Sequence, residues 1–137
     1  MLPEEYRDLA RIIGGAADTL EHGKWGQGAN ISRNGICMSQ ALLVHIGTRK
    51  RRTVRNQMLF WSTCLIFPEK HQGWHLDWEL PAMERAIWRP HEIMNFNDSQ
   101  GRSKQEVLDK LRLGEKEALR RATDVEFFPD EYKRKKE

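Results

Sequence analysis

Apolar residues near the N-terminus recur at alternating spacings of four and three, the period of an apolar stripe along one helix face. The stripe consists of Leu2, Tyr6, Leu9, Ile13, Ala16 and Leu20. Pro3 suits the first turn of such a helix, and Gly23 is well placed to terminate it. The pattern therefore predicts a first helix, in which Gly14 and Gly15 form a thin waist where another backbone can approach.

Two more helical patterns follow in the middle of the chain. One runs from about Ile36 to Ile46, with Asn34 near its cap and Gly47 at its end. Its expected inward-facing residues are Cys37, Ala41, Leu43 and Val44. The other repeats apolar residues at helical spacing until Pro68 stops it. These residues are Val54, Met58, Trp61 and Leu65. The aromatic and β-branched content of residues 60–67 leaves a strand open as an alternative.

Two segments lack helical periodicity. Residues 23–35 are rich in glycine and asparagine and predict a loop, with a short extended piece as an option. Residues 71–78 contain two tryptophans, two histidines and a glycine, and predict a loop that is packed by its aromatic side chains. Binding residues often lie on loops, so both segments are places to look for function.

The C-terminal half predicts one short and one long helix. Pro81 opens the short helix, and Pro90 ends it. Its apolar face comprises Leu80, Met83 and Ile87, and a turn from Asn95 to Gly101 follows. Ser103 and Glu106 have the spacing of a capping box and mark the start of the last helix. Its apolar residues are Val107, Leu108, Leu111, Ala118, Leu119 and Ala122.

These patterns predict a mainly α-helical, single compact domain of about five helices over residues 1–128, with a flexible charged tail over 129–137. A length of 137 residues suits one domain, and 31% charged residues indicate a charged, solvated surface. No apolar run is long enough to span a bilayer, and the acidic N-terminus is unlike a secretory signal. We therefore expect a cytoplasmic protein without membrane contact, in which Cys37 and Cys64 are free thiols.

A group of basic residues stands at the predicted start of the third helix. It consists of Arg49, Lys50, Arg51, Arg52 and Arg55. Positive charge there opposes the helix dipole, and a bound anion or an acidic partner would relieve that conflict. The group is therefore either a solvated helix end or a contact surface for an acidic protein or for nucleic acid.

Four tryptophans, Trp25, Trp74, Trp78 and Trp88, lie in or beside predicted loops. Such residues either pin a loop to the core or form an exposed patch of the kind that anchors protein interfaces. Trp25 is the first to test, because the glycines around it leave little else to hold its loop.

Cys37 is the strongest catalytic candidate, since the dipole of a helix favours a nucleophilic thiol in its first turn. His91 would then serve as the base, with Asn95, Asn97 and Asp98 as orienting partners. A structural cysteine is the commoner role. An Asx-turn ahead of the last helix is enough to explain Asn97 and Asp98.

A zinc site is a further option, with Cys37, Cys64, His71 and His75 as its ligands. No pair of cysteines shows the close spacing that structural zinc sites use. We therefore predict no metal site and no other cofactor.

Three groups of residues carry a resemblance. They are residues 16–20 with 25–28 (Ala-Ala-Asp-Thr-Leu and Trp-Gly-Gln-Gly), residues 37–42 (Cys-Met-Ser-Gln-Ala-Leu), and Asn97-Asp98 with Gly101-Arg102-Ser103 and Val107-Leu108. Together they resemble a family of small proteins of unknown function from actinobacteria and their bacteriophages. In that family a tryptophan usually precedes the Asn-Asp pair, and here Phe96 takes its place. The resemblance leaves about residues 48–89 unmatched and implies a small protein, encoded by a phage, that acts in the host cytoplasm.

We therefore expect a non-catalytic accessory protein that binds a host or phage macromolecule, with a protein ahead of nucleic acid as the partner. The predicted binding residues are Trp25, Gln27, Arg49, Lys50, Arg51, Arg52, Arg55, Asn97 and Asp98. One alternative is a nucleic-acid-binding protein that uses residues 49–55. The other is a thiol-dependent hydrolase centred on Cys37, with His91 and Asp98 as further catalytic candidates.

Overall fold

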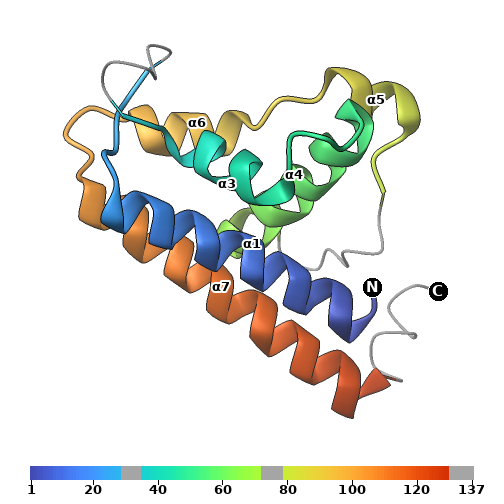
Figure 1. Ribbon diagram of the computed structural model, residues 1–137. Helices are drawn as coiled ribbons and strands as arrows, with labels where there is room; N and C mark the ends of the chain where they lie inside the picture. Colours follow the sequence, from blue (N-terminus) through green and yellow to red (C-terminus); the bar gives the residue numbers. More distant parts are fainter. Residues whose placement is uncertain (29–34, 72–78, 130–137) are drawn as a thin grey trace.

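The computed structural model describes residues 1–28, 35–71 and 79–129. Its longest elements, α1 (Pro3–His22) and α7 (Lys104–Phe127), lie antiparallel and in contact (Figure 1). The other described helices are α3 (Met38–Ile46), α4 (Arg52–Ile66), α5 (Ala82–Ile87), α6 (His91–Asp98) and the short 3₁₀ helix η1 (Pro68–Lys70). All five predicted helices are present, and the mainly α-helical single domain is confirmed.

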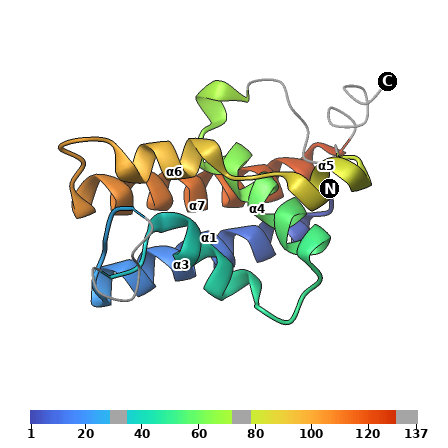
Figure 2. The same cartoon turned by 90° about the horizontal axis from the view of Figure 1, so that it is seen from above.

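The shorter helices cover one side of the α1–α7 pair (Figures 1 and 2). Helix α3 packs on α1, α4 packs on α7 and α3, α5 contacts α4, and α6 contacts α3. Among the described residues the extended structure is a single parallel bridge between Trp25 and Ile36, which confirms the short extended piece. The strand alternative for residues 60–67 is wrong, because this segment lies in α4 up to Ile66. No helix in the described part of the chain is long and apolar enough to cross a membrane.

One core joins buried side chains from α1, α3, α4, α6 and α7. Among its fully buried members are Ile13, Ala16 and Leu20 of α1, Leu42 of α3, Leu65 of α4, Ile93 of α6 and Leu111 of α7. The predicted stripe on α1 is therefore confirmed from Tyr6 to Leu20, while Leu2 is exposed. The sequence could predict the α1 part of this core, because helical periodicity depends only on the spacing of residues along the chain.

Five further expected apolar positions face solvent instead. They are Val44 in α3, Val54 in α4, Met83 and Ile87 in α5, and Leu119 in α7. Leu119 directly follows the buried Ala118, and neighbouring helical residues are about 100° apart around the axis, so both cannot face the core squarely. Leu80, which precedes α5, is buried. Met83 and Ile87 within α5 are exposed.

Two predicted boundaries are wrong. Pro90 is the N-cap of α6, so most of the predicted turn from Asn95 to Gly101 is helical. A proline lacks an amide hydrogen and suits the start of a helix as well as its end, which is why the pattern misled. Helix α3 begins after Cys37, and Asn34 lies outside the described residues, as do residues 72–78 and the charged tail from 130 onward.

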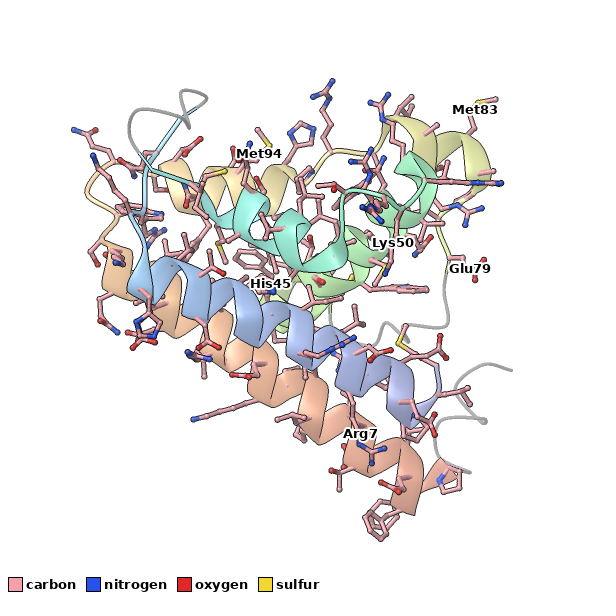
Figure 3. All side chains as sticks on the ribbon, in the orientation of Figure 1. Arg7, His45, Lys50, Glu79, Met83 and Met94 are labelled. Carbon is pink, nitrogen blue, oxygen red and sulfur yellow. The ribbon has the colours of Figure 1, made fainter. Side chains whose placement is uncertain are left out.

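Glycines in the helices meet side chains of other elements, and the predicted close approach of a backbone at Gly14 and Gly15 is wrong. A Cβ at Gly14 would meet the Glu115 carboxylate, and one at Gly15 would lie 2.5 Å from the His45 ring. His45 reaches α1 from α3 and places its Nε2 2.7 Å from Thr19 Oγ1 (Figure 3). These side chains fill the waist of α1.

At Gly114 in α7 the close neighbour includes the backbone of α4. A Cβ at Gly114 would lie 2.7 Å from Ile66 Cγ1 and 3.1 Å from its Cα. We expect Gly114→Ala to lower the free energy of unfolding by about 1–3 kcal/mol, because the methyl group collides with a neighbouring helix. Urea unfolding followed by circular dichroism measures this change.

Gly14→Ala is the matched control. Its methyl group meets the end of a flexible glutamate, and alanine favours the helix by about 1 kcal/mol, so stability should change by less than about 1 kcal/mol. Equal losses in the two variants would contradict the close approach of α4 and α7.

Glu117 makes the stability of α7 depend on pH. Burial raises the pKa of its carboxyl, but hydrogen bonds from Arg120 and Arg121 outweigh burial and leave the pKa below its ordinary value of 4.5. The donors are Arg120 Nη2 at 2.6 Å and Arg121 Nε at 2.9 Å. Since the folded pKa is the lower one, this contribution is complete above about pH 4.5 and is lost as the pH falls through the folded value.

We therefore expect Glu117→Gln to reduce the loss of stability on acidification below about pH 5. Urea midpoints measured from neutral pH to about pH 3 test this for the variant and the wild type. A variant whose midpoint falls as steeply as that of the wild type would show that Glu117 does not contribute.

Candidate functional site

The side chain of Asn97 joins three segments that are distant in sequence. It lies in the last turn of α6 and is 1% exposed. Its Oδ1 accepts hydrogen bonds from Trp25 Nε1 at 2.7 Å and from the Met38 amide at 3.0 Å. Its Nδ2 donates to the Gly26 carbonyl at 3.1 Å and to Asp98 Oδ1 at 2.9 Å. We call these five residues the Asn97 hub.

The segment of residues 24–28 is held against α6 by further bonds. Gln27 Nε2 donates to the carbonyls of Asn97 and Ser99 at 2.9 and 3.0 Å. The amide of Gly28, which has a φ of +82°, donates to Asp98 Oδ1 at 2.9 Å. The described bonds of Asn97 and Asp98 to main-chain amides reach Met38 and Gly28, so the predicted local Asx-turn is replaced by long-range contacts. For Trp25 the geometry favours the interpretation that it pins its loop.

The turn from α6 to α7 carries the rest of the predicted motif. The Phe96 ring lies 5.7 Å from that of Phe67, and the Arg102 guanidinium lies 3.8 Å above the Phe96 ring centre. Arg102 Nε also donates to the Phe96 carbonyl at 2.8 Å. Ser103 and Glu106 form the predicted capping box. An aromatic residue before the Asn-Asp pair thus provides the surface on which the arginine stacks.

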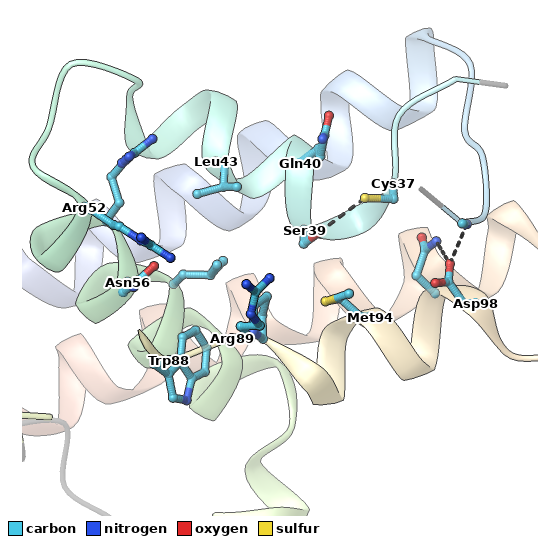
Figure 4. Close-up of a pocket in the computed structure, with 15 residues that line it drawn as sticks. Cys37, Ser39, Gln40, Leu43, Arg52, Asn56, Trp88, Arg89, Met94 and Asp98 are labelled. Atoms are coloured by element: carbon cyan, nitrogen blue, oxygen red, sulfur yellow. Dashed lines mark hydrogen bonds between the residues drawn. The ribbon is translucent and has the colours of Figure 1, made fainter. Parts of the chain in front are cut away.

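A pocket of about 470 Å³ lies beside the Asn97 hub, between α3 and α4 on one side and residues 88–98 on the other (Figure 4). Its polar lining includes Cys37, Ser39, Gln40, Arg52, Arg55, Asn56, Arg89, Asn97 and Asp98. Its apolar lining includes Leu43, Leu59, Trp88, Pro90 and Met94. In Figure 4 Arg52 and Trp88 lie toward one end, and Cys37 and Asp98 lie at the other.

The described arginines fall into two groups by their partners. Those that form ion pairs with carboxylates are Arg7, Arg11, Arg102, Arg112, Arg120 and Arg121. Those for which the structure shows no ion pair with a described residue are Arg49, Arg51, Arg52, Arg55, Arg85 and Arg89. The second group lies entirely in residues 49–55 and 85–89, where Lys50 also lies. We call these seven basic residues the arginine cluster.

The start of α4 adds to the positive potential of this cluster. Arg51 is the N-cap, no side chain caps the helix, and the first turn contains no acidic residue. The helix therefore supplies no carboxylate of its own beside its first amides. The Nε atoms of Arg55 and Arg85 are buried and have no hydrogen-bond partner in the described part of the chain. The carboxylate of α5 is Glu84, for which no ion pair with a described arginine is seen.

Cys37 is the N-cap of α3, so the prediction that it lies within the first turn is wrong. Its Sγ lies 3.3 Å from Ser39 Oγ. Cys37 and Asp98 both line the pocket, whereas His91 does not. No described hydrogen bond joins Cys37 to Asp98 or to His91. Burial raises the pKa of the other thiol, Cys64, to about 12, which leaves it protonated near neutral pH.

Of the four residues considered as zinc ligands, His71 is bonded to Glu92 at 2.9 Å, and His75 lies outside the described residues. Where side chains are described, no three His, Cys, Asp or Glu residues come together as a possible metal site.

A model for a family of unknown function, DUF6197, matches residues 5–117. The chain belongs to this family. The DUF6197 match includes residues 48–89, which the resemblance had left unmatched. Comparisons with curated proteins and with solved structures give no match. Membership in DUF6197 therefore defines the relationship and supplies no activity.

In this DUF6197 member the structure brings together part of the predicted site. Arg52, Arg55, Asn97 and Asp98 line one pocket, and Cys37 joins them. Gln27 contacts the same end of α6 from the side of the hub. The sequence-based prediction missed Arg85 and Arg89, whose spacing of four residues would have placed them on one face of the predicted helix over residues 81–90. In the structure Arg89 lies beyond the end of α5.

Asn97→Ala should lower the free energy of unfolding by about 3 kcal/mol or more. The change removes four hydrogen bonds and leaves a partly buried indole N–H and a buried amide without an acceptor, each costing about 1–3 kcal/mol. Urea unfolding of Asn97→Ala and of Asn95→Ala provides the comparison. Asn95 is exposed on the same helix, and its change should stay within about 0.5 kcal/mol. A loss below about 1 kcal/mol for Asn97→Ala would contradict the hub.

Proposed function

We propose that this protein is a non-catalytic accessory protein, encoded by a phage and acting in the host cytoplasm, that binds an acidic protein partner through the arginine cluster. The partner places carboxylates against Arg51 and Arg52, which are exposed at the start of α4. The proposal moves the interface away from Trp25 and Gln27, whose side chains are engaged in contacts with α6.

The observation that carries the proposal is the unequal pairing of the arginines. Arg112 shows the paired state, with Asp18 at 2.5 Å and Glu115 at 3.2 Å. The cluster has no such described partners, although the chain as a whole carries 20 acidic residues against 23 basic ones. The charges along α1 and α7 are balanced, whereas those around the start of α4 are not. This difference favours the arginine cluster as a surface that receives negative groups from another molecule.

Exposed apolar residues beside the cluster favour a protein as the partner. Met83 and Ile87 of α5 are 81% and 71% exposed, and Arg85 lies between them in the same short helix. Figure 3 shows Met83 pointing away from the body of the molecule. Methionine and arginine are enriched in protein interfaces, whereas nucleic-acid phosphates require no apolar contact.

Nucleic-acid binding through residues 49–55 is the second candidate, because a helix start flanked by guanidinium groups also suits phosphate. This candidate predicts that the affinity for nucleic acid falls steeply with salt concentration and that binding survives the loss of Met83 and Ile87.

Arg52→Glu is the test variant for the proposed function. It should reduce capture of the specific partner at least tenfold, because it replaces a cation with an anion in the first turn of α4. A glutamate there favours the helix dipole, so the variant should fold. Affinity purification of tagged protein from nuclease-treated host lysate, with quantitative mass spectrometry, measures capture.

Lys116→Glu is the control, since it makes the same charge reversal at an exposed position of α7. It should leave capture unchanged. Equal losses in the two variants, or a partner that survives Arg52→Glu, would contradict binding through the cluster. Capture that disappears after nuclease treatment would favour the nucleic-acid candidate instead.

A further inference from the structure

The pocket has an arrangement of charge that the binding of a protein surface does not require. Arg52, Arg55 and Arg89 line it, and no ion pair between these three and a described carboxylate is seen. Its carboxylate is Asp98, whose Oδ1 already accepts from the Gly28 amide and from Asn97 Nδ2. The pocket lining therefore carries a net charge of +2, from three arginines and one aspartate.

Arg55 gives the clearest sign of a missing acceptor. Its Nε is buried and has no hydrogen-bond partner among the residues that the structure describes, although buried donors in proteins almost always find one. The residue projects from the first turn of α4, where the helix amides reinforce positive potential. An anion in the pocket would supply both an acceptor and a compensating charge.

The number of guanidinium groups favours phosphate over carboxylate. A phosphate monoester carries a charge of about −1.5 to −2 at neutral pH and presents three acceptor oxygens. Guanidinium groups bind such oxygens in a forked geometry, whereas one arginine suffices for a carboxylate.

The rest of the pocket fits an organic body attached to the phosphate. Leu43, Leu59, Trp88 and Met94 provide apolar surface, and the volume of about 470 Å³ lies within the range of sites for small organic ligands. Trp88 is held edge-on to Phe60, with ring centres 5.6 Å apart. Ser39, Gln40 and Asn56 offer hydrogen-bonding groups along the same walls.

We propose that this pocket binds an organic phosphate monoester of the size of a nucleoside monophosphate. The three arginines hold the phosphate, and the body lies along Leu43 and Met94 toward Ser39 and Gln40. This site goes beyond the proposed partner binding, since it needs no second protein. The two share Arg52, and a small phosphate in the pocket would therefore compete with an acidic partner for that residue.

Isothermal titration of the purified full chain with adenosine 5′-monophosphate tests the proposal. We expect saturable binding with one site per chain. Adenosine, which lacks the phosphate, and inorganic phosphate, which lacks the body, should each bind at least tenfold more weakly. No saturable binding up to millimolar concentration, or equal affinity for inorganic phosphate, would overturn the proposal.

A matched pair of variants separates a built site from general attraction to a basic surface. Arg89→Gln removes a guanidinium from the pocket and should weaken binding about tenfold or more. Arg49→Gln removes the same charge from an exposed position outside the pocket and should change affinity less than about twofold. Equal losses in the two variants would show that the attraction is non-specific and would overturn the site.

Met94→Trp keeps every arginine and fills the pocket with a larger side chain. Met94 is exposed on α6, so the variant should fold, which circular dichroism checks. Nucleotide binding should be lost while capture of a protein partner remains. Retained nucleotide binding in Met94→Trp would overturn the pocket as its site, and loss of partner capture alone would bear on the proposed function instead.

Discussion

The amide side chain of Asn97 is the constraint on which the arrangement of this protein depends. Trp25, Gly26 and Met38 come from segments that share no continuous element with α6, and all three bond to this one side chain. An amide has both donor and acceptor atoms, so it can satisfy an indole, a backbone amide and a carbonyl at once. A carboxylate or an apolar residue of the same size would leave at least one of them unpaired in the interior.

The hub also explains what the residues that carry the resemblance do together. Asn97 positions the loop and the start of α3, Asp98 holds Gly28, and Arg102 stacks on Phe96 and binds its carbonyl. Each of these side chains bonds to or stacks on a group that another part of the chain presents. These residues therefore form a structural hub, and the proposed phosphate site lies in the pocket beside it.

Electrostatics divides the molecule into two regions. Along α1 and α7 most cations meet carboxylates, as Arg112 does with Asp18 and Lys110 with Glu69. Around the start of α4 and α5 the cations lack such described partners. A net charge of +3 gave no hint of this division, because the balance is local and not global.

The fold could largely be predicted, since helical periodicity and the Ser103–Glu106 capping box are local signals. Helix α6 was missed because a proline marks both starts and stops. The hub could not be predicted, as Trp25 and Asn97 are 72 positions apart and nothing local announces their contact. The pocket combines both cases: its basic residues at 49–55 were visible in the sequence, but their meeting with Arg89 and Met94 is a product of tertiary packing.

Asn97 and Asp98 belong to the Asn97 hub and also line the pocket. The α1–α7 pair owes its packing to its own apolar seam, whereas residues 24–28 and the start of α3 hold to α6 through a few polar bonds. Such a boundary is where a small domain opens locally at a cost below that of global unfolding. A molecule bound in the pocket would therefore contact the two residues that hold this boundary closed.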